Sequence, residues 1–231
     1  MRVVALIPAA GKAERMGGPV KKQFLPLVGR PVLAQTLLKF EGSPSVNGII
    51  PIVDEGDLSF VAQELLPPLS LKKVLAVVPG GLTRQESVMS GLGAAGEGWD
   101  IVVIHDGVRP LVPLGLIEEV ISSAFKFGAV TAALPARDTV RLMGADGRFE
   151  KTLERERVVL IQTPQAFLYP LIKEAHLKAR EDGFVGTDDA ALVERLGYKV
   201  VMIEGSPLNI KITTREDMAL AEAILRGQGC G

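Results

Sequence analysis

Residues 3–24 read VVALIPAAGKAERMGGPVKKQF, and this stretch combines the two features that organise the whole chain. Its first five residues are all apolar, which is typical of a strand buried on both faces. Small and basic residues follow directly, and small residues let backbone N–H groups approach an anion closely. The stretch therefore predicts a buried strand that ends at an anion-binding loop.

The same alternation continues along the chain. Further apolar runs predict strands at 48–54, 73–78, 101–106 and 129–135, and helical spacing of apolar residues predicts intervening helices at 31–40, 60–66, 83–95 and 116–127. Wholly apolar strands that alternate with helices indicate a parallel sheet covered on both faces. We predict one α/β, Rossmann-like domain over residues 1–231, whose strands end at a common ligand-binding edge.

Residues 137–157, RDTVRLMGADGRFEKTLERER, break this alternation. The segment is too polar for a parallel sheet, and the GADG at its centre predicts a two-stranded β-ribbon with a tight turn. An isolated ribbon is marginally stable, so we expect it to pack on something, such as a second subunit. After it we predict a strand at 158–162, helices near 169–181 and 188–196, a strand at 198–204 and a helix at 213–225, which complete the sheet and its cover.

Composition excludes several classes of protein. The chain has 231 residues with 26 Lys+Arg against 27 Asp+Glu, so it lacks the basic field of a nucleic-acid-binding protein. No apolar run approaches the roughly 18–20 residues that span a bilayer, so we expect no membrane segment. The single cysteine, Cys230, cannot form an intrachain disulfide, which favours a reducing compartment such as the cytoplasm.

The first loop concentrates positive charge after the first strand. Lys12, Arg15, Lys21 and Lys22 lie within eleven residues and suit a polyphosphate, although a solvated basic loop has the same composition. The loop contains neither a GxxxxGK[ST] P-loop nor the GxGxxG dinucleotide fingerprint.

A second candidate loop is GGLTRQESV, residues 80–88. The spacing of Thr83 and Glu86 predicts a capping box at the start of a helix. Arg84, Ser87 and the free N–H groups of this helix could then face a ligand, and a simple turn before a capped helix is the alternative.

The third candidate loop is VVIHDGVRP, residues 102–110. Charged groups at the end of an apolar strand need partners. Asp106 is a candidate Mg²⁺ ligand, directly or through water, and a structural ion pair with Arg109 is the alternative. We expect His105 to be packed with a satisfied hydrogen bond. In NIKIT, Lys211 should point away from the face of Ile210 and Ile212, either into water or into the cleft.

Several motifs together resemble a known family. PAAGKAERM, KKQF, GGLTRQESV, VVIHDGVRP, RDT, LER, TPQAF, TDDA and NIKIT occur in the order and spacing of the 2-C-methyl-D-erythritol 4-phosphate cytidylyltransferases of non-mevalonate isoprenoid synthesis. The resemblance runs from Val3 to about Leu225. It implies a nucleotidyltransferase fold, with Mg²⁺ bridging the phosphates of CTP and with a homodimer that shares its active sites.

The resemblance also implies residue roles. It assigns CTP to Pro8, Ala9, Ala10 and Gly11, with cytosine near Gly81 and Ser87, and it assigns charge stabilisation during transfer to Arg15 and Lys22. The methylerythritol phosphate would lie beside Asp106, Gly107, Arg109, Thr163, Thr187 and Lys211. Thr139 and Arg155, on the ribbon, would reach the neighbouring subunit's site.

Two positions depart from the family pattern. Ala13 stands where many members have a second glycine, and Leu82 stands where an acidic residue can occur after the double glycine. A side-chain role of position 82 in nucleotide binding is therefore in doubt.

Three alternative functions follow from the same residues. A cytidylyltransferase for ribitol phosphate or another polyol phosphate shares most of these motifs. An NAD-dependent oxidoreductase would use a doubly wound sheet, but the glycine fingerprint is missing. A nucleotide-sensing module would not need Lys22, Asp106, Arg109 and Lys211 together.

Overall fold

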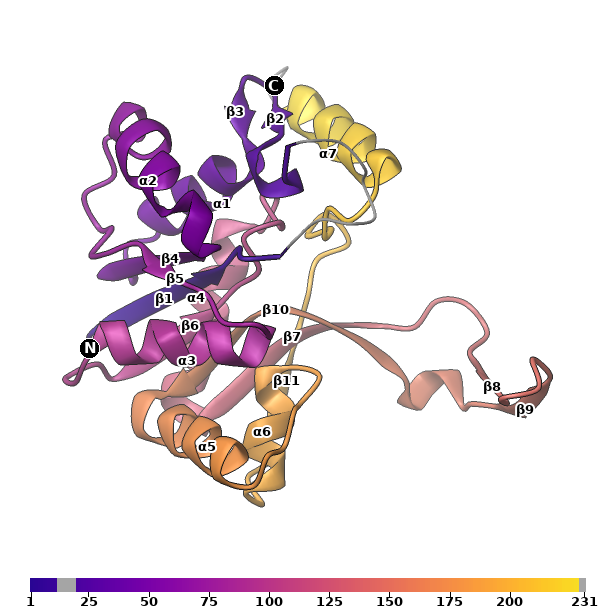
Figure 1. The fold of residues 1–231 in the computed structure, drawn as a ribbon. Coiled ribbons are helices and arrows are strands. Elements are labelled where there is room, and N and C mark those ends of the chain that lie inside the picture. Colours follow the sequence, from indigo (N-terminus) through magenta and orange to yellow (C-terminus); the bar gives the residue numbers. More distant parts are fainter. Residues whose placement is uncertain (12–19, 229–231) are drawn as a thin grey trace.

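A computed structural model describes residues 1–11 and 20–228 and contains a seven-stranded sheet (Figure 1). The sheet has the order β11-β7-β10-β6-β1-β4-β5, and β10 is antiparallel to both its neighbours while the other pairs are parallel. Its strands are β1 (Val3–Pro8), β4 (Gly48–Val53), β5 (Val78–Pro79), β6 (Ile101–Ile104), β7 (Ala129–Pro135), β10 (Val159–Leu168) and β11 (Val201–Glu204). The predicted Rossmann-like, mostly parallel sheet is confirmed.

Helices cover both faces of the sheet, because alternate residues of each strand point to opposite sides. Val3, Ala5 and Ile7 of β1 belong to a buried cluster with α1 (Val32–Glu41), α4 (Leu114–Phe127) and the helical segment formed by α2 (Leu58–Phe60) and a π-helix (Val61–Leu65). Val4 and Leu6 belong to a second cluster with α3 (Arg84–Ala95), α5 (Tyr169–Glu181) and α6 (Asp189–Arg195). Short 3-10 helices occur at Lys22–Phe24, Glu55–Asp57, Pro67–Leu69 and Arg155–Arg157.

The expected strand at 73–78 is largely absent. The structure has an isolated bridge between Ile49 and Val74 and the two-residue β5. This segment lies at the edge of the sheet with β4 as its one strand neighbour, and Leu75 is half exposed. An apolar run at an edge has fewer partners to hold it in a continuous ladder than a central run has.

The last helix, α7 (Arg215–Gln228), does not cover the sheet as expected. Its Ala221 belongs to a separate buried cluster with Leu27, Leu111 and Ile212. Leu27 lies in the small hairpin of β2 (Pro26–Leu27) and β3 (Arg30–Pro31), which is next to α7 in Figure 1. The helix thus packs on the β2–β3 hairpin and not on the seven-stranded sheet.

The predicted ribbon is present and projects away from the sheet (Figure 1). It consists of β8 (Arg141–Met143) and β9 (Phe149–Thr152), which pair antiparallel. The turn between them includes Gly147 at φ +78°, a conformation that glycine adopts without steric cost.

Four residues discussed above, Lys12, Ala13, Arg15 and Cys230, lie outside the described ranges. Within those ranges, no helix combines the length and the apolar composition needed to cross a membrane.

Candidate active site

A cavity of about 200 Å³ lies where β1 and β6 end and α3 begins. It is lined by Pro8, Ala9, Ala10, Gly11, Lys22, Gln23, Gly81, Leu82, Thr83, Arg84, Ser87, Asp106, Val108 and Lys211. The three candidate loops and the NIKIT segment therefore meet at one edge of the sheet, as predicted.

The beginning of the first loop is held in place from two sides. The backbone N–H of Ala9 donates to the carbonyl of Ile52 at 2.7 Å. The buried Gln23 donates through Nε2 to the carbonyl of Ala9 at 2.8 Å and to that of Gly11 at 3.3 Å. Gln23 was not among the predicted site residues, although it lies in the KKQF motif. Its bonds fix the small-residue loop, and the neighbouring Lys22 lines the cavity.

The capping box at the start of α3 is confirmed. The Thr83 hydroxyl accepts from the backbone N–H of Glu86 at 3.1 Å, and the Glu86 carboxylate accepts from the N–H groups of Leu82 at 2.6 Å and Thr83 at 3.2 Å. The Ser87 hydroxyl accepts from the N–H of Gly81 at 3.1 Å. Leu82 is 97% exposed at the rim, so its side chain forms little of the wall.

Replacing Gly81 with alanine should lower the melting temperature, because the new Cβ would overlap Glu86 Cβ and disrupt a cap of about 0.5–2 kcal/mol. A thermal melt measures the effect. Gly93→Ala in the same helix is the control, since its Cβ would meet nothing within 4 Å and the substitution should be stabilising. A Gly81→Ala variant that melts at the wild-type temperature would contradict the close contact between position 81 and Glu86.

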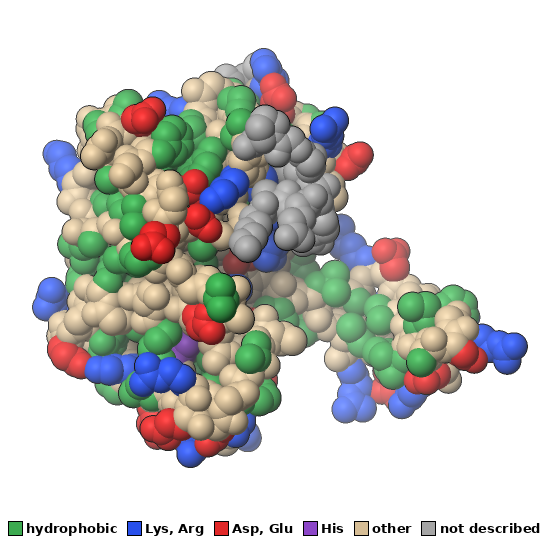
Figure 2. All heavy atoms as spheres, in the orientation of Figure 1, with side chains coloured by type: hydrophobic (Ala, Val, Ile, Leu, Met, Phe, Trp, Pro, Cys, Tyr) green, Lys and Arg blue, Asp and Glu red, His purple; other side chains and the backbone are tan. Residues whose placement is uncertain are grey.

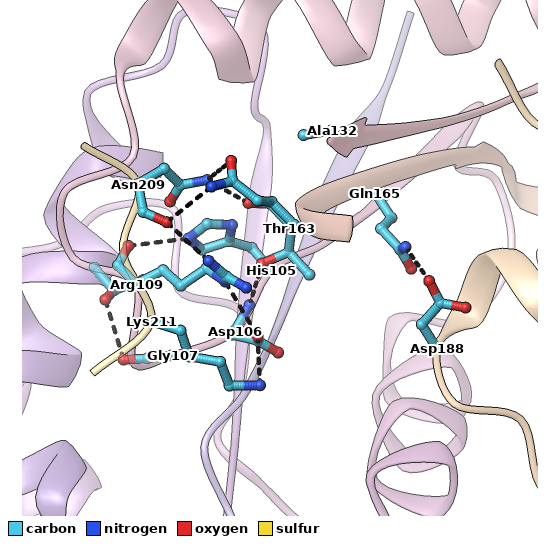
Figure 3. A network of polar contacts seen from close by, with 12 residues as sticks. His105, Asp106, Gly107, Arg109, Ala132, Thr163, Gln165, Asp188, Asn209 and Lys211 are labelled. Atoms are coloured by element: carbon cyan, nitrogen blue, oxygen red, sulfur yellow. Dashed lines mark hydrogen bonds and ion pairs between the residues drawn. The ribbon is translucent and has the colours of Figure 1, made fainter. Parts of the chain in front are cut away.

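Asp106 lies at the centre of a cluster of cations (Figure 3). Its Oδ2 is 2.9 Å from Lys211 Nζ and 3.3 Å from Arg109 Nε, and its Oδ1 is 3.5 Å from Arg84 Nε. The ion pair with Arg109, which the sequence left as the alternative to a metal-binding role of Asp106, is present, and of the two directions left open for Lys211 the structure has the one into the cleft. Within the described residues, the cluster holds more positive than negative side chains, which suits an anionic ligand.

The cluster fixes the protonation state of Asp106. Burial disfavours the charged carboxylate, but the attraction of Lys211, Arg84 and Arg109 outweighs burial and holds its pKa well below the usual range. The carboxylate is therefore ionised at neutral pH. Burial also lowers the pKa of His105 to about 4, so that imidazole is neutral. His105 Nε2 lies 3.1 Å from the carbonyl of Arg109 (Figure 3), as the expectation of a packed, hydrogen-bonded histidine requires.

Buried amide and hydroxyl groups support the cluster from behind. Thr163 accepts through Oγ1 from the backbone N–H of Asp106 at 3.0 Å. The side chain of Asn209 donates through Nδ2 to the backbone carbonyl of Thr163 at 2.7 Å. The backbone carbonyl of Asn209 accepts from Arg109 Nη1 at 2.8 Å. Figure 3 shows these groups converging from three separate segments.

Close packing joins the first and third loops. The Gly107 N–H donates to the carbonyl of Pro8 at 2.9 Å, and a Cβ at position 107 would lie 2.8 Å from Ala9 Cβ. Only a glycine fits this approach without a shift of the first loop.

Not every predicted site residue lies at the cavity. Thr187 is exposed in the turn before α6, and Thr139 and Arg155 lie on the exposed ribbon. Arg155 donates to the carbonyl of Arg137 at 3.3 Å, within the ribbon itself. Arg15 falls outside the described residues, so its predicted place in the site stays a prediction.

The lining residues fit a metal ion that is coordinated mainly by the phosphates of a substrate. Asp106 is the one carboxylate among the described lining residues, and no group of three or more potential ligands occurs in the described part of the chain. Mg²⁺ commonly takes one or two carboxylates and completes its shell with phosphates and water. The donor set thus suits Mg²⁺ on a triphosphate better than a metal enclosed by protein.

Comparison with known proteins agrees with this geometry. A sequence model of the 2-C-methyl-D-erythritol 4-phosphate cytidylyltransferase family matches residues 3–227. The chain is 47% identical over 231 residues to the 2-C-methyl-D-erythritol 4-phosphate cytidylyltransferase of Syntrophotalea carbinolica, covering 99% of this chain and 98% of that one. It is 46% identical to the protein of the same name from Syntrophus aciditrophicus, covering 97% and 96% of the two chains.

Solved structures are similar over nearly the same length. The crystal structure of the 4-diphosphocytidyl-2C-methyl-D-erythritol synthase of Anaerococcus prevotii has a TM-score of 0.86 at 32% identity and covers 97% of this chain and 96% of its own. The 2-C-methyl-D-erythritol 4-phosphate cytidylyltransferase of Thermus thermophilus has a TM-score of 0.81 at 36% identity, with 98% and 100% covered. Because sequence and structure both match from end to end, the chain belongs to the 2-C-methyl-D-erythritol 4-phosphate cytidylyltransferase family.

Proposed function

We propose that this protein transfers the cytidylyl group of CTP to 2-C-methyl-D-erythritol 4-phosphate and releases pyrophosphate. The observation that carries the proposal is the cavity itself, where a small-residue loop and a capped helix start face the cationic cluster around Asp106. The family match supplies the identity of the two reactants.

The triphosphate belongs on the side of the first loop and α3. Pro8, Ala9, Ala10 and Gly11 present backbone to the nucleotide, and Gly81 and Ser87 lie where the base would bind. The first N–H groups of α3 and the positive end of its dipole favour negative charge at this point.

The acceptor belongs on the side of Asp106 and Lys211. Arg109 pairs with the Asp106 carboxylate, and Thr163 accepts a hydrogen bond from the backbone N–H of Asp106. The Gly107 N–H donates to the carbonyl of Pro8, which places this loop next to the first loop. Thr187 would have to reach the acceptor from the turn before α6. The runner-up acceptor class, ribitol phosphate or another polyol phosphate, has no observation in its favour here.

In the transfer step, an oxygen of the acceptor phosphate attacks the α-phosphorus of CTP. The bond from this phosphorus to the oxygen that bridges it to the β-phosphate breaks, and pyrophosphate leaves with that electron pair. Both reactants are polyanions, so the protein must place them in line and neutralise charge. Lys22 and Arg15 would do so at the triphosphate, and Lys211 at the acceptor. When bound, Mg²⁺ would supply further charge neutralisation, and Asp106 would hold it directly or through a water molecule.

The ribbon supports a two-fold dimer. Its strands carry exposed apolar side chains, Leu142, Met143 and Phe149, and hydrophobic side chains (green) extend along the projecting arm in Figure 2. A two-stranded ribbon is marginally stable alone, and pairing with another copy would bury these side chains and stabilise it. Thr139 and Arg155 would then serve the partner's site. Light scattering should give twice the chain mass, and a monomer at micromolar concentration would contradict the dimer.

The direct test of the reaction is a pyrophosphate-release assay with each of four nucleoside triphosphates and several polyol phosphates. We expect release with CTP and methylerythritol phosphate and little with any other pair. Preference for ribitol phosphate would favour the runner-up, and absence of release with every pair would favour a nucleotide-binding module.

The single cysteine cannot form an intrachain disulfide, so the compartment that we propose for this protein is the reducing cytoplasm.

Replacing Arg109 with alanine should weaken acceptor binding by about tenfold or more and CTP binding by much less, because it removes a charge-assisted contact from Asp106. Calorimetry with each ligand separately measures the two changes. Equal losses for both ligands would show that Arg109 does not belong to the acceptor side.

A further inference from the structure

Arg84, in the first turn of α3, is shared unequally between two carboxylates. Its Nη1 donates to Asp189 Oδ2 at 2.6 Å, whereas its Nε lies 3.5 Å from Asp106 Oδ1, the limit of a hydrogen bond. Its Nη2 is buried and has no partner among the described residues. The guanidinium is therefore held mainly by Asp189, although Asp106 is close enough to compete for it.

Asp189, the first residue of α6, is itself fixed by two other elements. Its side chain is 1% exposed, and its Oδ1 lies 3.0 Å from His176 Nε2 of α5. Its backbone N–H donates to Gln165 Oε1 of β10 at 3.2 Å. Gln165 in turn donates to Asp188 Oδ2 at 2.7 Å (Figure 3). Asp189 is thus a rigid anchor, and it lies outside the set of residues that line the cavity.

The anchor determines which oxygen of Asp106 stays available. Oδ2 receives both Lys211 and Arg109, whereas Oδ1 has only the long contact with Arg84 among the described residues. An ionised carboxylate has about four lone-pair sites, so Oδ1 retains acceptor capacity. A guanidinium pairs readily with both oxygens of one carboxylate. An Arg84 released from Asp189 would therefore cover Oδ1.

From this geometry we infer that Asp189 is a positioning residue, which holds Arg84 away from Asp106 and thereby keeps Asp106 Oδ1 open to a hydroxyl group of the polyol-phosphate acceptor. The inference rests on the proposed cytidylyl transfer and deepens it. It assigns to Asp189 a role exerted through Arg84 and without contact with either reactant. His176 and Gln165 serve by keeping Asp189 in place.

The test is Asp189→Asn, which keeps the shape of the side chain and removes its charge. We expect the acceptor KM to rise about tenfold or more, because the acceptor loses one hydrogen bond to a charged group. The calorimetric Kd for CTP should change less than about threefold. Asp182→Asn is the control. It removes a carboxylate that pairs with Arg195 at 2.7 Å, just after α5, and should leave both constants unchanged.

A crystal structure of Asp189→Asn gives a readout independent of activity. We expect Arg84 to leave position 189 and to pair through two nitrogens with Asp106. An Arg84 that stays in place, or a KM that moves no more than in Asp182→Asn, would overturn the inference. Wild-type protein is assayed first with CTP and methylerythritol phosphate. An inactive wild type contradicts the proposed function, whereas an active wild type with these negative results contradicts only the role of Asp189.

A structure of the wild-type protein covers the case in which Asp189→Asn does not fold. Crystals with bound 2-C-methyl-D-erythritol 4-phosphate test the same arrangement without a substitution. We expect an acceptor hydroxyl within hydrogen-bond distance of Asp106 Oδ1, with Arg84 Nη1 still on Asp189. An Arg84 paired through two nitrogens with Asp106, or a bound acceptor that makes no contact with Oδ1, would overturn the inference.

Discussion

Replacing Lys22 with alanine should slow cytidylyl transfer about 100-fold or more, the usual cost of one preorganised charge donor at about 2.7–4 kcal/mol. Lys22 lines the cavity and is adjacent in sequence to Gln23, which is hydrogen-bonded to the first loop. Single-turnover kinetics with saturating CTP separates this loss from weaker binding.

Lys21→Ala is the matched control for that variant. The Lys21 ammonium pairs with Asp57 at 2.7 Å and with Asp54 at 3.3 Å, and Lys21 does not line the cavity. Its removal should change the rate far less than removal of Lys22, because the Lys21 ammonium is engaged by these two carboxylates outside the cavity. A folded Lys22→Ala protein with turnover like that of Lys21→Ala would show that Lys22 has no part in the transfer.

Two inactive variants should restore activity when their subunits are mixed. If the ribbon of one subunit serves the site of the other, a heterodimer of Lys22→Ala with Arg155→Ala collects both defects in one site and neither in the second. Roughly half of the wild-type activity per heterodimer should then return, because a two-fold dimer has two equivalent sites. Each variant alone should stay inactive.

Mixing needs proof of exchange, which differently tagged subunits and co-purification supply. Lys22→Ala mixed with a Lys22→Ala, Arg155→Ala double variant is the control, since no complete site can form in it. A mixture as inactive as its parents after verified exchange would mean that each site comes from one chain. The ribbon would then serve only in dimer contact or lie in solvent.

The central strands could be predicted because a strand that is buried on both faces is apolar at nearly every position. The apolar runs of β1 and β6 predicted both strands, and the runs lie next to each other in the sheet. The direction of β10 could not be predicted, because an apolar run has the same composition in a parallel or an antiparallel ladder. The segment at 73–78 has an apolar run as well, but an edge position holds only part of it as a strand.

The position of the site was predictable, whereas its supporting contacts were not. Loops that follow parallel strands must meet at one edge, so Gly11, Gly81 and Asp106 could be placed together. The ion pair of Arg84 with Asp189 joins residues 105 positions apart, and no local pattern records such a contact. Thr187, which resemblance alone placed at the acceptor, is exposed in the turn before α6.

The most direct measurement is ³¹P NMR of the product formed from CTP and 2-C-methyl-D-erythritol 4-phosphate with Mg²⁺. Attack of the acceptor phosphate on the α-phosphorus predicts two coupled diphosphate resonances from one new molecule, with pyrophosphate appearing in equal amount. Omission of the acceptor should leave CTP intact. Release of CMP instead of a coupled diphosphate, or CTP unchanged in the complete mixture, would contradict the assignment of this chain as a cytidylyltransferase.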